Sequence, residues 1–237
     1  AGSGATTDRR ESVNSRERVF RQITGQEVDR IPLMGGWFHG ARNLAALSGL
    51  SVEDYLRHPA TNLIKANRAL AIDCMVDPII PTQVNQVRTA ETLDADFDHI
   101  QPEDLVQIAA GIPDSAEEIL ASFDFQAEEA KCRSRLLDRM SLFGNIVLVP
   151  NFWESVPHFH LYSVYGYRPY LEAIALYPEA VGRIFWQDAI CARARNQILI
   201  RLIRELGLPP VLFTSSSIGP EVPLQNVIAA YRYAAEG

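Results

Sequence analysis

The sequence predicts an α/β fold with a parallel sheet, of the (β/α)8 TIM-barrel type, of which this chain would form about the first half. Four short apolar runs, typical of buried strands, begin near Ile31, Cys74, Asn145 and Pro210. Helical patterns separate them, and a repeated strand–helix alternation is typical of parallel sheets and barrels. A complete barrel has eight such units in roughly 250 residues, whereas this chain of 237 residues has about half of them.

Residues 1–14 are polar and lack periodicity, which predicts a flexible tail before a single domain at 15–237. Asn14 and Glu17 form a capping pair for a first helix, which we expect to end near Gly25. The strand VDRIPLMGGWF follows. Caps, proline positions and apolar periodicity predict the later helices. One begins at Ser51, and the others span residues 59–72, 115–140, 168–176 and 178–206. Later strands are predicted within 71–81, 144–153 and 209–219, with an inserted excursion at 82–100.

Composition excludes several classes of protein. Hydrophobic content is 47% and charged content is 22%, as in ordinary globular domains. No run reaches the eighteen or so apolar residues that a membrane span needs. The net charge of -7 argues against nucleic-acid binding. Three widely spaced cysteines without a CxxC pair are typical of reduced thiols, so we expect a cytoplasmic protein.

Ligands of parallel α/β folds bind beyond the carboxyl ends of the strands. This rule selects four candidate stretches, Gly35–Arg42, Asp77–Gln83, Pro150–His160 and Thr214–Glu221. The last offers only hydroxyls and backbone groups, and it has no GxSxG elbow. The chain contains no GxGxxG and no GxxxxGK[ST] motif, so no nucleotide site is predicted.

The first stretch, GGWFHGAR, combines flexible glycines with an aromatic ring, an imidazole and a cation. We interpret Trp37, His39 and Arg42 as substrate-binding residues, and Arg42 would hold a carboxylate or phosphate. The alternative is a glycine-rich turn with Trp37 in the core and Arg42 on the surface. Asp77, at the end of the second strand, is predicted to be catalytic by orienting a cationic or pyrrole-like N–H donor, whereas Asp73 is predicted to be structural.

The third stretch, PNFWESVPHFHLY, is the richest in polar and titratable side chains. His158 and His160 would share one face of an extended segment. With Glu154 they would form an N/N/O metal set, but HxH is a weak motif and no metal ligand is assigned. We interpret His158 as catalytic and Asn151, Glu154 and His160 as substrate-binding; the alternative is that the histidines are hydrogen-bonded structural residues.

Five segments, in this order and spacing, resemble the uroporphyrinogen decarboxylase superfamily. They are SRERVFRQITGQEVDRIPL, AIDCMVDPIIPTQVNQ, VRTAETLDADFDHI, YGYRPYLEAIALYPEAVGRIF and LGLPPVLFTSSSIGP, which together run from about Ser15 to Pro220. The resemblance implies a (β/α)8 barrel with a cleft at the carboxyl ends of its strands. By the same resemblance, Asp77 matches an aspartate that holds pyrrole N–H groups, and His158 falls near a substrate-facing tyrosine.

The chain departs from both main activities of that family. Decarboxylases have an RQAGR-like stretch after the first strand, where this chain reads MGGWFHGAR and keeps only Arg42. The methyltransferases bind zinc through a His-x-Cys motif, which this chain does not contain. The fourth strand carries Ser215 and Ser216 where an acidic pair is often seen.

The resemblance leaves three functions open. The first is methyl transfer between a corrinoid and a thiol, with a corrinoid protein as partner and zinc held by ligands outside this chain. The second is cofactor-free decarboxylation of a porphyrinogen-like polycarboxylate. The third is a half-barrel subunit that pairs with a partner chain or a second copy. We expect a small-molecule substrate, a homo-oligomer or partner chain, and no nucleic acid or membrane partner.

Overall fold

The computed structural model describes residues 13–36, 38, 40–76, 78–84, 100–150 and 161–211. The chain divides into two compact units, and each is considered by itself. The first unit comprises residues 1–86, 135–150 and 207–211, and the second comprises residues 87–134, 151–206 and 212–237. The predicted excursion at 82–100 and the predicted fourth strand at 209–219 lie mostly outside the described residues.

A parallel three-stranded sheet, in the order β1–β2–β3, lies in the first unit. The strands are β1 (Met34–Gly35), β2 (Cys74–Met75) and β3 (Val147–Leu148). Met34 pairs with Cys74, which pairs in turn with Val147. The strands thus start level with one another and end level with one another.

The prediction of half a TIM barrel is wrong. The structure is mostly helical, and its sheet is small and not closed. One physical reason is the proline next to each apolar run: Pro32 precedes β1, and Pro78 and Pro150 follow β2 and β3. Proline has no N–H donor for a strand ladder, so these strands stay two residues long. The third functional hypothesis, a half-barrel subunit that pairs with a partner chain, assumed this barrel and is therefore also wrong.

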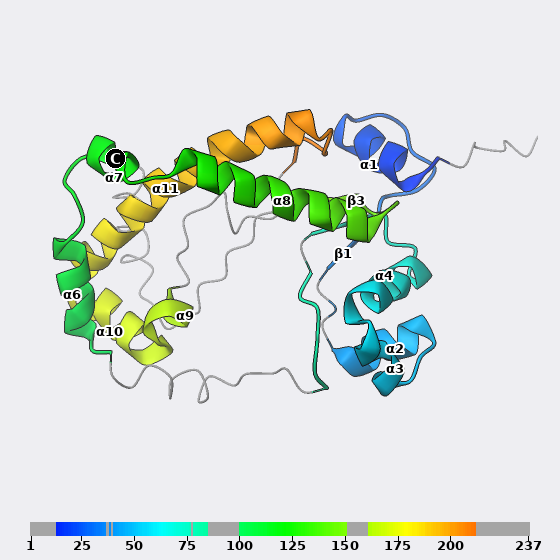
Figure 1. Ribbon diagram of the computed structural model, residues 1–237, viewed down its shortest axis with the longest axis horizontal. Helices are drawn as coiled ribbons and strands as arrows, with labels where there is room; N and C mark the ends of the chain where they lie inside the picture. The colour runs from blue at the N-terminus through cyan, green and yellow to red at the C-terminus, as the bar shows by residue number, and fades with distance from the viewer. Residues whose placement is uncertain are drawn as a thin grey trace, which may run out of the picture. The chain divides into compact units, whose positions relative to one another are not determined.

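The described part of the first unit contains four whole helices. They are α1 (Ser15–Ile23), α2 (Ala41–Ser48), α3 (Val52–Arg57) and α4 (Pro59–Ala69). Helix α2 packs against α3 and α4, while α1 contacts β2 and β3 (Figure 1). Two predicted caps are confirmed: the side chain of Asn14 accepts from the Glu17 N–H at 2.9 Å, and that of Ser51 accepts from the Asp54 N–H at 3.1 Å.

The second unit is helical where the structure describes it. Its elements are α6 (Pro102–Ala110), α7 (Ala116–Ala121), the first half of α8 (Phe125–Phe143), α9 (Tyr162–Tyr165), α10 (Tyr167–Leu176) and α11 (Pro178–Glu205). The predicted helices at 168–176 and 178–206 are confirmed. The single helix predicted at 115–140 is instead α7 and α8, because Asp124 accepts from the Ala127 N–H and caps a second start.

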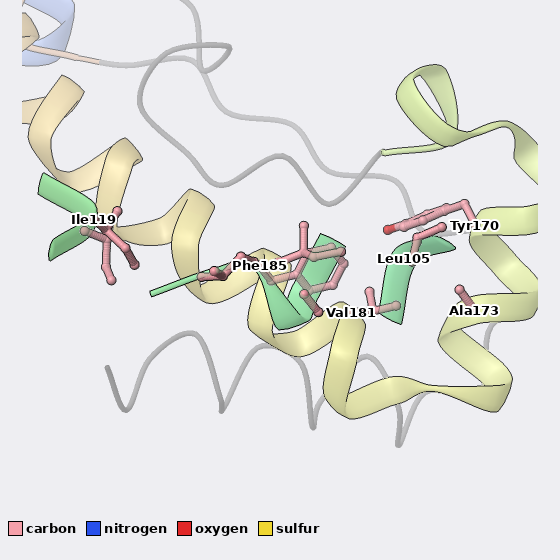
Figure 2. Close-up of a cluster of buried hydrophobic side chains, with 10 residues drawn as sticks. Leu105, Ile119, Tyr170, Ala173, Val181 and Phe185 are labelled. Carbon is pink, nitrogen blue, oxygen red and sulfur yellow. The ribbon is translucent and has the colours of Figure 1, made fainter. Parts of the chain in front are cut away.

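One hydrophobic core joins four helices of this unit. Leu105 of α6 and Ile119 of α7 are buried with Tyr170 of α10 and with Val181 and Phe185 of α11 (Figure 2). The apolar residues of these helices, which we expected to pack on a barrel sheet, pack against one another instead.

Helices α8 and α11 are joined by ion pairs within this unit. Arg133 pairs with Glu205 at 2.7 Å, and Arg201 pairs with Glu129. Both pairs join residues 72 apart in sequence, so the two helices run in the same direction, as Figure 1 shows. These side chains are partly exposed, so each pair contributes at most about 1 kcal/mol.

Truncating the core at α6 tests this packing. Leu105→Ala removes a side chain that is 0% exposed, and we expect the free energy of unfolding to fall by about 2–5 kcal/mol. Its neighbour Val106 is 37% exposed on the same helix, so Val106→Ala is the matched control, with an effect of about 1 kcal/mol or less. Urea unfolding, monitored by hydrogen exchange at the amides of α6 and α11, measures the loss of stability in both variants. Equal losses for the two variants would contradict the assigned core.

Candidate functional site

The carboxyl end of the sheet, where the three strands stop, is the candidate functional site. The strands end at Gly35, Met75 and Leu148, side by side and in parallel. The backbone of β1 leaves the sheet through Gly36, whose φ of +117° is one that residues with a Cβ rarely adopt. A Cβ on Gly36 would lie 2.8 Å from Cγ2 of Val76 and 3.1 Å from its carbonyl oxygen. Gly36 therefore lets the ends of β1 and β2 approach each other closely, while a Cβ on Gly35 would lie 2.6 Å from the Asn67 side chain.

Seven of the eight predicted site residues lie outside the described residues. They are Trp37, His39, Asp77, Asn151, Glu154, His158 and His160. In sequence, Trp37, Asp77 and Asn151 come two or three residues after the last residues of β1, β2 and β3. Their convergence at one site stays a prediction.

Arg42 is the predicted site residue that the structure places. It is exposed in the first turn of α2, directly after the glycine-rich exit from β1. The N-cap residue Gly40 provides no side-chain hydrogen bond, and this first turn has no acidic residue. Within the described part of the chain, no carboxylate pairs with Arg42. Because a helix N-terminus repels cations and attracts anions, this turn suits a negatively charged ligand group.

Sequence reasoning missed α2 itself. We interpret the segment GGWFHGAR as a substrate-binding stretch or a turn, and we predict no helix between the first helix and Ser51. The usual start signals are a Ser, Thr, Asp or Asn cap and an acidic first turn, but here the cap position is Gly40 and the first turn has no acidic residue. The signal that remained was Gly49, which ends the helix with a φ of +67°.

The amino end of the sheet is closed by a buried carboxylate, that of Asp73. Its side chain is 0% exposed and accepts five hydrogen bonds. Ser15 and Leu33 donate at 2.9 Å, Arg18 donates at 2.5 Å, and Arg30 donates through both terminal nitrogens at 2.5 and 3.0 Å. Burial alone would raise the pKa of Asp73, but these donors outweigh it and hold the pKa below its usual range. The prediction that Asp73 is structural is confirmed.

Asp29 completes the same cluster. The Arg18 guanidinium grips both of its carboxylate oxygens, at 2.7 and 2.8 Å, which lowers the pKa of Asp29 to about 2. The pKa of Arg18 is raised in turn, first by Asp29 and then by Asp73. Two arginines thus balance two aspartates, and this neutral cluster has the paired geometry of a structural ion network.

A hollow of about 640 Å³ lies beside α1 and β3. Its lining includes Asn14, Arg16, Met140, Asn145, Leu148 and Leu208. Arg16 is already used, because it donates to the Gly207 carbonyl at 2.6 Å. Arg42, the predicted site residue that the structure describes, does not line the hollow, so the hollow is not assigned to the candidate site.

Two further findings concern metals and membranes. No group of three or more His, Cys, Asp or Glu side chains within the described ranges has an arrangement that could hold a metal ion. None of the helices described is both long enough and apolar enough to cross a bilayer.

Comparison with known proteins gives no relative. No protein-family model matches the chain, no curated protein is significantly similar to it, and no solved structure matches its fold.

Removing the Asp73 carboxylate charge is expected to destabilise the first unit. Asp73→Asn leaves two guanidinium groups without their shared partner, so the free energy of unfolding at pH 7 should fall by about 3 kcal/mol or more. Since folding lowers the pKa of Asp73 and Asp29, their stabilisation is complete above the unfolded pKa of about 4. It is lost as the pH falls toward about 2, the folded value for Asp29. Urea unfolding across this range should therefore show the two proteins converging.

The control is Asp138→Asn, which removes the same charge from an exposed position on the part of α8 in the first unit. We expect a change within about 0.5 kcal/mol. A stability gap between wild type and Asp73→Asn that stays constant down to pH 2 would contradict the ionised cluster.

A methyl group at Gly36 tests the close approach of β1 and β2. Gly36→Ala combines an unfavourable φ with a clash against Val76, so we expect a loss of about 2–4 kcal/mol. Gly49→Ala is the matched control, because Gly49 also has a positive φ but an added Cβ would meet nothing within 4 Å. It should cost about 1–2 kcal/mol from backbone strain alone. Thermal unfolding measures both, and equal losses would show that no tight contact exists at Gly36.

Proposed function

We propose that this chain is an enzyme whose small-molecule substrate binds at the carboxyl end of the β1–β2–β3 sheet. The observation that carries the proposal is the parallel register of the strands, which ends all three at one place. Ligands of parallel sheets bind in this position because the loops that leave adjacent strands meet there. The proposal depends on the sheet and needs no closed barrel.

The substrate carries a carboxylate or phosphate group, which binds at Arg42 and the first turn of α2. Support comes from the exposed guanidinium, the absence of an acidic residue in that turn and the lack of a side-chain cap. An anionic group would receive backbone N–H hydrogen bonds and a guanidinium pair together. Trp37 and His39 are proposed to contact the same substrate.

The proposed reaction is methyl transfer that involves a corrinoid or a thiol acceptor, which the resemblance to the uroporphyrinogen decarboxylase superfamily implies. Asp77 and His158 are the proposed catalytic residues, and Asn151, Glu154 and His160 are proposed to bind substrate. Any zinc ligands and the corrinoid protein would be supplied from outside this chain. A bound zinc would lower the pKa of a thiol and make it a nucleophile.

Decarboxylation of a porphyrinogen-like polycarboxylate is the second candidate reaction. The position of Arg42 favours it, because a substrate with several carboxylates needs cationic partners at its binding site. In this reaction Asp77 would orient pyrrole N–H groups and no cofactor is needed.

We further propose a cytoplasmic location. All three cysteines, Cys74, Cys132 and Cys191, are free thiols. Burial raises the pKa of Cys74 to about 11, so this thiol is protonated and unreactive at neutral pH. Unpaired thiols are typical of proteins from reducing compartments.

Neutralising Arg42 tests the anion site. We expect Arg42→Gln to weaken binding of the carboxylated ligand by about 10- to 100-fold, the effect of losing a charge-assisted hydrogen bond. The matched control is Lys65→Gln, because Lys65 is an exposed cation on α4 of the same unit. Calorimetric titration with a porphyrinogen and with a corrinoid, together with the zinc content of the full chain, separates the two candidate reactions. Affinity for neither tetrapyrrole and an absence of zinc would contradict both.

A further inference from the structure

Exposed apolar side chains lie on the two backbone segments that leave β1 and β2 at the carboxyl end of the sheet. Phe38 is 50% exposed and Ile79 is 64% exposed. Phe38 comes three residues after the end of β1, and Ile79 comes four residues after the end of β2. A single exposed apolar residue is ordinary on a protein surface, but large ones on neighbouring segments beside a candidate site indicate a surface that binds a ligand.

The residues around Ile79 hold it in its exposed position. It belongs to the segment 78–81, which reads PIIP and in which both prolines are buried. Each proline ring restricts its own backbone φ to a narrow range, so this segment is stiff and is packed at both ends. Ile79 is therefore presented to solvent by an anchored backbone, as in a preorganised binding surface.

The two segments start against each other. A Cβ on Gly36 would lie 2.8 Å from Cγ2 of Val76, so the two backbones are adjacent where the strands end. Phe38 follows Gly36 by two residues and Ile79 follows Val76 by three. Chain geometry limits their Cα atoms to about 7 Å and about 11 Å from the Cα atoms of Gly36 and Val76. Both side chains therefore belong to the end of the sheet at which we place the substrate.

A single cation accompanies this apolar surface. Arg42 follows Phe38 by four residues, it is exposed, and no carboxylate among the described residues pairs with it. It is the only Lys, Arg, Asp or Glu in residues 35–43, and residues 78–86 contain none of these. The complementary ligand thus has one negatively charged group and a larger apolar part.

We propose that the substrate of this site is an amphiphilic anion, with a carboxylate or phosphate at Arg42 and an apolar chain or ring on Phe38 and Ile79. The inference rests on the proposed function and adds the chemistry of the rest of the substrate. Covering the two side chains removes apolar area from water, which stabilises the complex. Two side chains provide much less than the roughly 800 Å² that each partner buries in a stable protein interface, so this surface fits a small molecule better than a protein.

Straight-chain carboxylates from acetate to octanoate test the inference. Each probe has the same charged group, so differences in affinity along the series measure the apolar contact. Burying one CH₂ group changes an affinity by up to about fourfold, so we expect the dissociation constant of the full chain to fall by about two- to fourfold for each added CH₂. Chemical-shift titration by NMR measures these weak affinities.

Three variants and a control separate the two contacts. Phe38→Ser and Ile79→Ser should flatten the rise in affinity along the series and leave acetate binding unchanged. Arg42→Gln should weaken every member by a similar factor, about tenfold or more, and leave the rise intact. The matched control is Ile31→Ser, because Ile31 is apolar and 75% exposed in the same unit but precedes β1. Circular dichroism confirms that each variant is folded.

The anion site and the apolar contact fail in different ways. Equal affinity from acetate to octanoate, weakened throughout by Arg42→Gln, would overturn the amphiphilic substrate and leave the anion site in place. A rise that neither Phe38→Ser nor Ile79→Ser reduces would overturn it as well. Binding of no member of the series would contradict the proposed anion site and this inference with it.

Discussion

The first unit depends on the buried carboxylate of Asp73. This one side chain binds α1 through Ser15 and Arg18, and it binds the approach to β1 through Arg30 and the Leu33 N–H. Each strand has only two residues in the ladder, so backbone pairing alone gives little cohesion. Burying an aspartate is costly unless it is fully paired. The hydrogen bonds and ion pairs of Asp73 therefore hold the beginnings of α1, β1 and β2 together. They position the short strands as much as the backbone hydrogen bonds between the strands do.

The two ends of the sheet consequently have different properties. The amino end is filled with matched charges and has little freedom to change. The carboxyl end has Gly35 and Gly36, followed by a helix whose first turn carries Arg42, a cation with no carboxylate partner among the residues that the structure describes. A rigid amino end can hold the carboxyl end in position while the loops there differ in sequence, which is how parallel α/β folds separate stability from chemistry.

Local signals in the sequence predicted local structure well. The caps at Asn14 and Ser51, the start of α11 at Pro178 and the structural role of Asp73 all depend on contacts between near neighbours or on burial, and all are confirmed. Strand length and barrel closure failed because they depend on partners far along the chain. An apolar run such as residues 144–153 has the same pattern whether it pairs along its whole length or for two residues before a proline. For the candidate site, the sequence predicted where the strands end, but it did not predict the helix that carries Arg42.

The same structure explains what the family resemblance contains. The segments SRERVFRQITGQEVDRIPL and AIDCMVDPIIPTQVNQ hold Ser15, Arg18, Asp29, Arg30 and Asp73, which together are the side chains of the amino-end cluster. Within these two segments, the charged residues therefore attach α1 to the beginnings of β1 and β2. A reaction is determined at the other end of those strands, where this chain reads MGGWFHGAR and departs from the decarboxylase pattern. The letters shared with that family thus lie mainly in a structural cluster, and both proposed reactions depend on residues beyond the other end of the strands, such as Arg42.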